Sequence, residues 1–320
     1  MKIAILGAAD IAFRRFLPAL RACPALEYAG VASRSPEKGE KFKAAFGGSV
    51  YPSYKAALAD PEVEAVYLPL PPALHAPWGE RALEAGKHVL MEKPFSTSLA
   101  ETKALLDLAE ARGLAVQENY MFLYHSQLKT IRELIESGEL GQVWLYRISF
   151  GIPRRQSEDF RLSRALGGGA LLDCGGYPIR LAWELLGESG RVTQAELRVP
   201  RGAEVDFFGS AVLENDERVG AHVSFGIDNA YQCTLEAWGS RATLIASRFF
   251  TAGAGVRPEL ILRRSTEQTR LELPEDDHFL HSMEAFSAMT RDMAARKAQR
   301  AAILRQARLV EDVRKYAERP

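Results

Sequence analysis

The chain has 320 residues, of which 47% are hydrophobic and 26% charged, which is typical of a globular protein long enough for two domains. Basic and acidic residues both number 41, so the zero net charge argues against a broad face for nucleic acid or a membrane surface. The three cysteines are scattered, which argues against a disulfide framework. The apolar runs fall short of the ~18 residues that a membrane span needs. We therefore expect a cytoplasmic protein.

Short apolar runs alternate with amphipathic stretches over the first ~120 residues, which predicts an α/β domain with a doubly wound parallel sheet. The expected strands are Lys2–Leu6, Glu27–Ser33, Ala65–Leu70, His88–Met91 and Ala115–Glu118. Pro18 lies inside the first expected helix and predicts a kink or a short first segment there. A later helix is expected to end at Gly86, and Ser98 with Glu101 predicts a capping box that opens a helix running to about Arg112.

The pattern changes after residue 120. We expect a helix over Leu128–Glu136, a strand near Gln142–Phe150 and helices from Asp277 onward. Between Arg191 and Leu273, short β-type runs follow one another with brief turns, which implies antiparallel pairing because parallel strands need long crossovers. The sequence therefore predicts a Rossmann domain over residues 1–120 and an α+β domain over residues 121–320. The second is expected to contain a large, mostly antiparallel open sheet, with C-terminal helices that can pack back on the first domain.

The stretch ILGAADIA, residues 5–12, follows the first expected strand. It places Gly7, Ala9 and Ala12 at the three positions of the dinucleotide-binding pattern G-x-G-x-x-G/A. Gly7 keeps the tight turn, and Ala12 is an accepted third residue. The backbone from Ala8 through Asp10 and Ile11, at the start of the helix, is expected to contact a pyrophosphate.

The tip of the second strand indicates which dinucleotide binds. An NAD-binding protein usually places an acidic residue there to bind the adenosine ribose, but this chain reads Ser33-Arg34 with Lys38 shortly after. A hydroxyl and a guanidinium suit a 2′-phosphate, so we expect NADP(H) as the cofactor. The alternative is that Arg34 is a solvated side chain in a loop that leads into a helix.

Three further motifs carry a family resemblance. They are GKHVLMEKPFSTS with Glu92-Lys93-Pro94, LPLPPALH over Leu68–His75, and the D-x-G-x-Y pattern of Asp173 and Tyr177. Together with Gly7 they resemble the glucose–fructose oxidoreductase, inositol dehydrogenase and MocA family over nearly the whole chain. The stretches GAADIAFRRFLPAL, ENYMFLYH and GGGALLDCGGYP are most similar to its nucleotide-sugar branch, the dTDP-3-keto-deoxysugar 3-ketoreductases.

The resemblance implies a Rossmann domain followed by an open antiparallel sheet that often mediates oligomerisation, so a homodimer or homotetramer is expected. It implies that Lys93 lies near the nicotinamide and the reacting oxygen, within the cofactor-binding Glu92-Lys93-Pro94 turn. It also implies cofactor roles for Leu70, Pro71 and His75, and for Asn119 beside Glu118. His75 alone would more often be a histidine at a helix start.

Many relatives in this family have histidine where Tyr177 stands, so the chain resembles the tyrosine branch. A tyrosine pKa of ~10 is lowered by an adjacent ammonium, so Tyr177 is expected to be the general acid and Lys93 its electrostatic partner. Asp173 would share a helix face with Tyr177 and orient one of these groups or a substrate hydroxyl. Lys93 as proton donor, and Tyr177 as a buried structural residue, remain alternatives.

An arginine-rich loop precedes this segment, and Arg154, Arg161 and Arg164 suit the diphosphate of a nucleotide sugar. Ion pairs with Glu158 and Asp159 are the alternative. We therefore expect NADPH-dependent reduction of a keto group on a sugar, most simply the 3-keto group of a nucleotide-linked deoxysugar. The alternatives are an NADP-dependent dehydrogenase of a free aldose, polyol or trans-dihydrodiol, and a non-catalytic NADP-sensing protein. The six histidines do not cluster, so no metal site is predicted.

Overall fold

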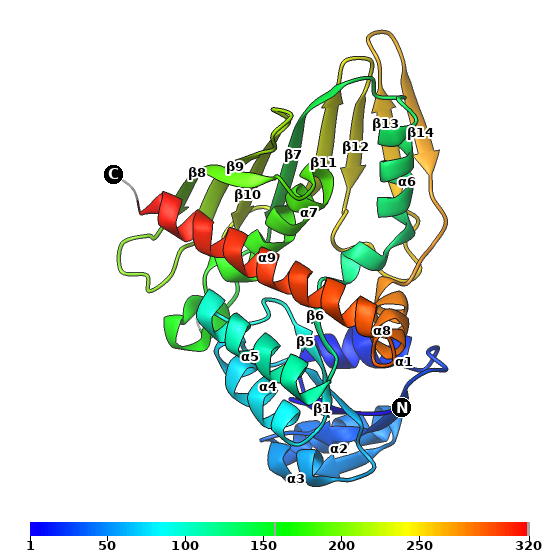
Figure 1. Cartoon of the computed structure of the whole chain (residues 1–320), viewed down its shortest axis with the longest axis vertical. Coiled ribbons are helices and arrows are strands. Elements are labelled where there is room, and N and C mark those ends of the chain that lie inside the picture. Colours follow the sequence, from blue (N-terminus) through cyan, green and yellow to red (C-terminus); the bar gives the residue numbers. More distant parts are fainter. Residues whose placement is uncertain (157, 319–320) are drawn as a thin grey trace. The chain divides into compact units, whose positions relative to one another are not determined.

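The computed structural model describes residues 1–156 and 158–318, which divide into two compact units (Figure 1). The first unit consists of Met1–Met121 and Phe279–Ala307. The second consists of Phe122–His278 and the chain from Arg308 onward. The chain therefore passes between the units three times, and the third passage falls inside a helix, α9 (Met293–Ala317).

The first unit is built on a six-stranded parallel sheet in the order β3-β2-β1-β4-β5-β6, the order of a Rossmann fold. Its strands are β1 (Lys2–Leu6), β2 (Glu27–Ala32), β3 (Ser49–Tyr51), β4 (Ala65–Leu68), β5 (His88–Glu92) and β6 (Val116–Asn119). The five predicted strands are confirmed, with ends that differ by at most two residues. The sixth, β3, was missed because an edge strand of three residues leaves no periodic pattern.

The α-helices of the first unit are α1 (Leu17–Leu20), α2 (Pro36–Phe46), α3 (Tyr54–Ala59), α4 (His75–Glu84), α5 (Leu99–Arg112), most of α8 (His278–Met289) and α9 as far as Ala307. Before α1 lies a π-helical turn, Ala12–Phe16, in which the amide of Leu17 donates to Ala12. Pro18 has no amide to donate to the carbonyl of Arg14, so a regular α-helical ladder cannot form there. The predicted irregularity at Pro18 is thus confirmed.

The capping box at α5 is only half formed. Ser98 accepts a hydrogen bond from the amide of Glu101, as predicted. The Glu101 carboxylate, however, accepts from the amide and hydroxyl of Thr97. The helix runs to Arg112, and Gly113 ends it in the left-handed conformation.

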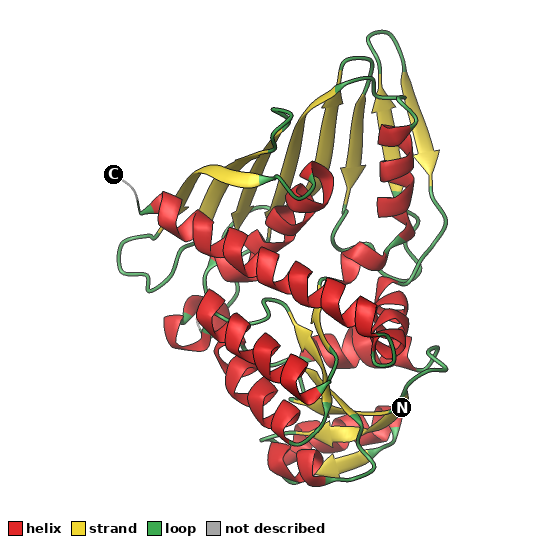
Figure 2. Ribbon diagram, viewed as in Figure 1, coloured by secondary structure: helices red, strands yellow, loops and turns green. Residues whose placement is uncertain are grey.

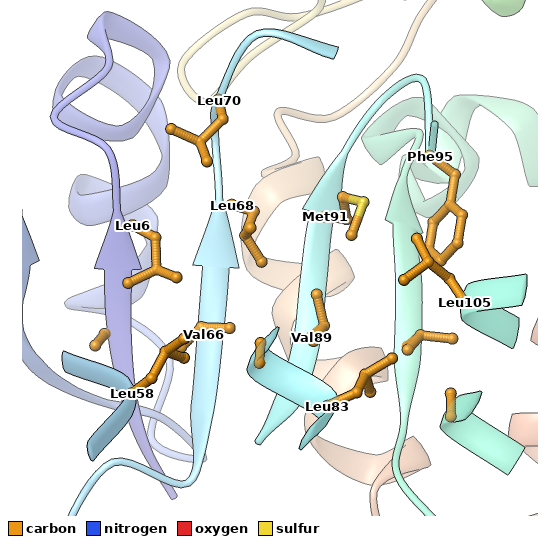
Figure 3. Packing of buried hydrophobic residues seen from close by; sticks show 14 of the residues in the cluster. Leu6, Leu58, Val66, Leu68, Leu70, Leu83, Val89, Met91, Phe95 and Leu105 are labelled. Atoms are coloured by element: carbon orange, nitrogen blue, oxygen red, sulfur yellow. The ribbon is translucent and has the colours of Figure 1, made fainter. Parts of the chain in front are cut away.

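The core of the first unit is a cluster of buried aliphatic side chains between the sheet and its helices (Figure 3). Helix α4 packs on β4 and β5 and lies beside α5. Leu70 and Phe95, just beyond the carboxyl ends of β4 and β5, close this core at the edge of the sheet. Ligands of doubly wound proteins bind at this edge.

The second unit contains one eight-stranded sheet, drawn in yellow in Figure 2, in the order β14-β13-β12-β11-β7-β10-β9-β8. Its strands are β7 (Val143–Gly151), β8 (Arg191–Arg198), β9 (Phe208–Glu214), β10 (Gly220–Gly226), β11 (Gln232–Gly239), β12 (Thr243–Ser247), β13 (Glu259–Arg263) and β14 (Gln268–Glu272). Strands β7 and β10 pair in parallel, and the other pairs in the described part of this sheet are antiparallel. The predicted open, mostly antiparallel sheet is confirmed.

One face of this sheet is covered and the other is open. Along β7, the buried side chains of Tyr146, Ile148 and Phe150 alternate with Arg147 and Ser149, which are exposed or half-buried. Helix α7 (Gly176–Leu186) packs over β7 and β10, and α6 (Ser126–Glu136) is the predicted helix before β7, two residues longer at its start. Among the described residues, no helix is long and apolar enough to cross a membrane.

Candidate active site

The loop after β1 has the shape of a dinucleotide cradle. Gly7 has a φ of +113°, and its amide donates to the carbonyl of Ala32 at the end of β2 (2.9 Å). This positive φ favours glycine, and a Cβ atom at this position would also lie 2.7 Å from a methyl group of Leu70. A helical turn begins at Asp10, directly after this loop, and the first amides of a helix lack intrahelical partners, which suits a pyrophosphate.

The predicted loop residues do not contribute equally. The amide of Ala9 donates to the carbonyl of Gly7 (2.8 Å), so Ala9 shapes the turn. Asp10 is exposed and pairs with Arg14 (3.3 Å), while Ala8 and Ile11 are half-buried. Backbone rather than side chains would therefore meet a ligand here.

Ser33 and Arg34 follow β2, the strand beside β1, at the same edge of the sheet. The hydroxyl of Ser33 accepts from the amide of Ser35, the residue that caps α2, while Arg34 and Lys38 are exposed. Two cations beside a helix N-terminus would suit an anionic group.

Tyr54, the first residue of α3, was not predicted and lies beside the Gly7 loop. Its hydroxyl lies 3.8 Å from the Cβ position of Gly7, and its ring packs edge-on against Trp78 (4.8 Å between centroids). Burial raises the pKa of Tyr54, and the charge of Arg34 opposes that rise. No pattern in the sequence placed Tyr54 near the Gly7 loop, because the preceding strand, β3, was itself not predicted.

Lys93 stands immediately after β5, in a turn held from several directions. Glu92 Oε1 accepts hydrogen bonds from the Tyr67 hydroxyl and from the Asn119 amide, each 2.7 Å long. Beyond Lys93, the amide of Phe95 donates to Glu118 (2.8 Å). These contacts come from β4 and β6, so both neighbouring strands fix the backbone that presents the ammonium.

The carboxylate of Glu92 belongs to a buried polar network. Asn119 accepts from the Ser282 hydroxyl (2.8 Å), which in turn accepts from Gln117 (2.8 Å). Burial raises the pKa of Glu92, while the hydrogen bonds from Tyr67 and Asn119 and the charge of Lys93 act in the opposite direction. Glu92 and Asn119, predicted to bind cofactor, thus have their side chains turned into the protein.

His75 is also turned inward. Its side chain is 0% exposed, with Nδ1 2.7 Å from the Pro94 carbonyl and Nε2 2.7 Å from the Leu70 carbonyl. Burial lowers the pKa of His75 to about 4, so the ring is neutral at pH 7 and donates to one of these carbonyls. His75 therefore ties the Leu70-Pro71 segment to the Lys93-Pro94 turn and would act on a cofactor through them.

In the second unit, Asp173 and Tyr177 lie on one continuous helical segment. It begins with a π-helical turn, Leu171–Gly175, and continues as α7. The segment therefore starts two residues before Asp173 and is not the regular α-helix that was assumed. Pro178, which has no amide for the carbonyl of Cys174, explains the irregular turn. The Tyr177 ring is 7% exposed and packs against Phe150 and Phe250 (centroids 4.9 and 5.4 Å away).

The carboxylate of Asp173 orients an arginine. Arg161 Nε donates to Asp173 (2.7 Å), and Arg161 Nη1 donates to Asp159 (3.1 Å). Burial disfavours the charge of Arg161, but the two carboxylates outweigh it and raise the pKa of the guanidinium. The structure thus brings together Asp173 and one of the three predicted substrate arginines.

The other two arginines contact different loops. Arg154 pairs with Asp228 after β10 (3.4 Å), and Arg164 donates to the carbonyl of Glu204 after β8 (2.6 and 2.9 Å). Both are exposed. Within residues 1–156 and 158–318, no group of three or more histidine, cysteine, aspartate or glutamate residues is placed to hold a metal ion.

The strand order of the first unit and the glycine turn at its carboxyl edge are those of a Rossmann-type dinucleotide-binding domain. Residues 1–120 match the model of the oxidoreductase family with an NAD-binding Rossmann fold, and residues 128–245 match the GFO/IDH/MocA C-terminal domain. The chain belongs to the GFO/IDH/MocA family of oxidoreductases.

Similar proteins include reductases of nucleotide sugars. A dTDP-3,4-didehydro-2,6-dideoxy-alpha-D-glucose 3-reductase of Streptomyces violaceoruber is 43% identical, over 99% of this chain and 95% of its own. The crystal structure of KijD10, a 3-ketoreductase from Actinomadura kijaniata in complex with NADP and TDP-benzene, has a TM-score of 0.94 at 38% identity, covering 98% of this chain and 97% of its own. A D-xylose 1-dehydrogenase (NADP(+)) of Haloferax volcanii is 32% identical, over 90% of this chain and 88% of its own.

Proposed function

We propose that this protein is an NADPH-dependent reductase of the 3-keto group of a dTDP-linked deoxysugar. One observation carries the proposal. The chain is 43% identical to such a reductase over 99% of its length, and the helical segment expected to face substrate carries the buried Tyr177 together with Asp173, which pairs with Arg161 from the preceding loop.

The cofactor, when bound, supplies the hydride that forms the new C–H bond at the carbonyl carbon. The protein must supply the proton for the carbonyl oxygen. Tyr177 donates its hydroxyl proton to that oxygen, and the ammonium of Lys93 stabilises the negative charge that develops there and on the phenol. Asp173 acts by holding Arg161. The products are the alcohol, oxidised cofactor and a tyrosinate that regains its proton from solvent.

The arginine-rich loop fits the diphosphate of such a substrate. Arg154, which pairs with Asp228, and Arg164 are exposed, whereas Arg161 is half-buried and pairs with both Asp159 and Asp173. We infer that Arg154 and Arg164 attract the diphosphate and that Arg161 fixes the position of the sugar.

Oxidation of NADPH in the presence of a dTDP-linked 3-ketosugar and of free ketoses tests this function. We expect kcat/KM for the nucleotide-linked ketone to exceed that for any free ketose by at least ~10²-fold, because binding energy from the nucleotide contributes to the transition state. Comparable rates for free ketoses would contradict the nucleotide-sugar assignment. Binding of NADPH without turnover of any ketone would favour a cofactor sensor instead.

Oxidation of a free aldose is the second candidate, because the chain is 32% identical to a D-xylose 1-dehydrogenase over 90% of its length. NADP⁺ reduction with D-xylose, at rates above those of ketone reduction, would favour this second activity.

For either activity, we propose that the open face of the second sheet, where Trp238 is 41% exposed, joins copies of the chain into a dimer or tetramer.

The cofactor preference is tested at Arg34. The Arg34→Ala variant should raise the KM for NADPH by ~10-fold and leave the KM for NADH nearly unchanged, because a lost charge-assisted hydrogen bond to a 2′-phosphate is worth ~1.5–3 kcal/mol. Arg112→Ala, a change of the same size at the exposed end of α5, is the matched control. An equal rise for both cofactors would contradict the 2′-phosphate role.

A further inference from the structure

The helical segment that carries Asp173 and Tyr177 is capped by a residue from a distant loop. Asp206 lies between β8 and β9, and its carboxylate Oδ2 accepts a hydrogen bond from the amide of Leu171 (2.7 Å). Its backbone carbonyl accepts from the amide of Ala170 (2.8 Å). The three residues before Ala170 are glycines, so the chain leading into the helix has no side chain of its own that could cap it.

At the contact between this loop and the helix start, Gly168 and Gly169 have no space for a side chain. Gly169 has a φ of +110°, and a Cβ atom there would lie 2.4 Å from Asp206 Oδ1. On the other side, the amide of Gly169 donates to the carbonyl of Arg161 (2.9 Å), and a Cβ atom on Gly168 would lie 2.4 Å from the same oxygen. The glycine segment is therefore clamped between the backbone of Arg161 and the side chain of Asp206.

These contacts close a ring of interactions around the helix start. Arg161 holds Gly169 with its carbonyl and Asp173 with its Nε. Asp206 holds Leu171, two residues before Asp173. Burial raises the pKa of Asp206, while the Leu171 amide and the charge of Arg314 work against that rise. A carboxylate at a helix N-terminus is also favoured by the helix dipole.

We propose that Asp206 is a positioning residue for the reaction: by capping the π-helical turn, it fixes where Asp173 and Tyr177 stand. The inference rests on the proposed role of Tyr177. No contact of Asp206 with a ligand is needed, since it acts through the helix that it caps. Displacements of ~1 Å at a reacting group can reduce rates by ~10²-fold, so loss of the cap should affect turnover.

The test compares Asp206→Ala, which removes the acceptor, with Asp206→Asn, which keeps an oxygen for the Leu171 amide. We expect Asp206→Ala to lower kcat by ~10-fold or more with the Kd for NADPH unchanged, and Asp206→Asn to retain kcat within ~3-fold of the wild type. Asp216→Ala is the matched control, since Asp216 is exposed on the turn between β9 and β10 and pairs with Arg191 (2.7 Å). Its kcat should be unchanged.

A double-mutant cycle separates positioning from general destabilisation. If Asp206 acts through Tyr177, Asp206→Ala should cost little further activity in a Tyr177→Phe background. Additive losses, or a wild-type kcat in Asp206→Ala, would overturn the proposal. Hydrogen exchange gives a readout that does not depend on the reaction. The amides of residues 170–173 should exchange faster in Asp206→Ala than in Asp206→Asn, and unchanged exchange would overturn the cap even if the proposed substrate were wrong.

Discussion

Replacing Tyr177 by phenylalanine is expected to lower kcat for ketone reduction by ~10²-fold or more while leaving the Kd for NADPH unchanged. The change removes one oxygen from a ring that packs against Phe150 and Phe250, so the aromatic packing is preserved. Cofactor binding is expected to survive because the Gly7 loop and Arg34 belong to the other unit. Single-turnover kinetics and a fluorescence titration with NADPH measure the two quantities.

Tyr146→Phe is the control for this experiment. Tyr146 is a buried tyrosine of the same unit, on β7, and burial raises its pKa to about 12. Its variant should retain the wild-type kcat. If Tyr177→Phe also retained it, the proton would have to come from elsewhere, and Lys93 would become the donor to examine.

The second large effect is expected at the cofactor loop. Gly7→Ala should weaken binding of NADPH by ~10–10²-fold, because a non-glycine residue at such a φ is strained by ~1–3 kcal/mol and its methyl group would collide with Leu70. A rotation of Leu70 can relieve the collision, but the backbone strain is relieved only by a change in the conformation of the loop. Isothermal titration with NADPH gives the Kd directly.

Gly86→Ala separates this local effect from the general cost of the substitution. Gly86 also has a positive φ, +73°, but a Cβ atom there would meet no neighbour within 4 Å. This variant should lose stability, seen as a lower Tm, and keep the wild-type Kd. A wild-type Kd in Gly7→Ala would mean that the loop does not hold the cofactor.

Much of the fold could be predicted because its signals are local. The buried strands β1, β2, β4, β5 and β6 are short apolar runs separated by amphipathic helices, and that alternation determines a parallel sheet. Pro18 predicted the break in the first helix because its missing amide acts on its own turn. Pro178 carries the same signal, but the π-helical turn before Tyr177 was not predicted from it. The cap on that turn could not be predicted, because Asp206 reaches Leu171 from 35 residues away in sequence.

The candidate site likewise contains residues that sequence motifs predicted and residues that they did not. Lys93, Asp173 and Tyr177 stand in motifs that can be read along the chain. Tyr67 and Ser282 do not stand in such motifs. Tyr67 joins the site through its hydrogen bond to Glu92, 25 residues away in sequence, and Ser282 joins it through its hydrogen bond to Asn119, 163 residues away. The inward orientation of His75 was likewise hidden, because a motif gives a residue's place and not the direction of its side chain.

The threefold passage of the chain between the two units has a consequence for biosynthesis. Ile303 belongs to the buried cluster of the first unit. Ser282, which belongs to the same unit, donates a hydrogen bond to Asn119. A ribosome that has released only the first 121 residues has therefore not yet delivered all the parts of the cofactor-binding unit. Domains usually fold in the order of their synthesis. Here the N-terminal unit can complete its core only after the sheet of the second unit has emerged, so the two units are expected to mature together late in translation.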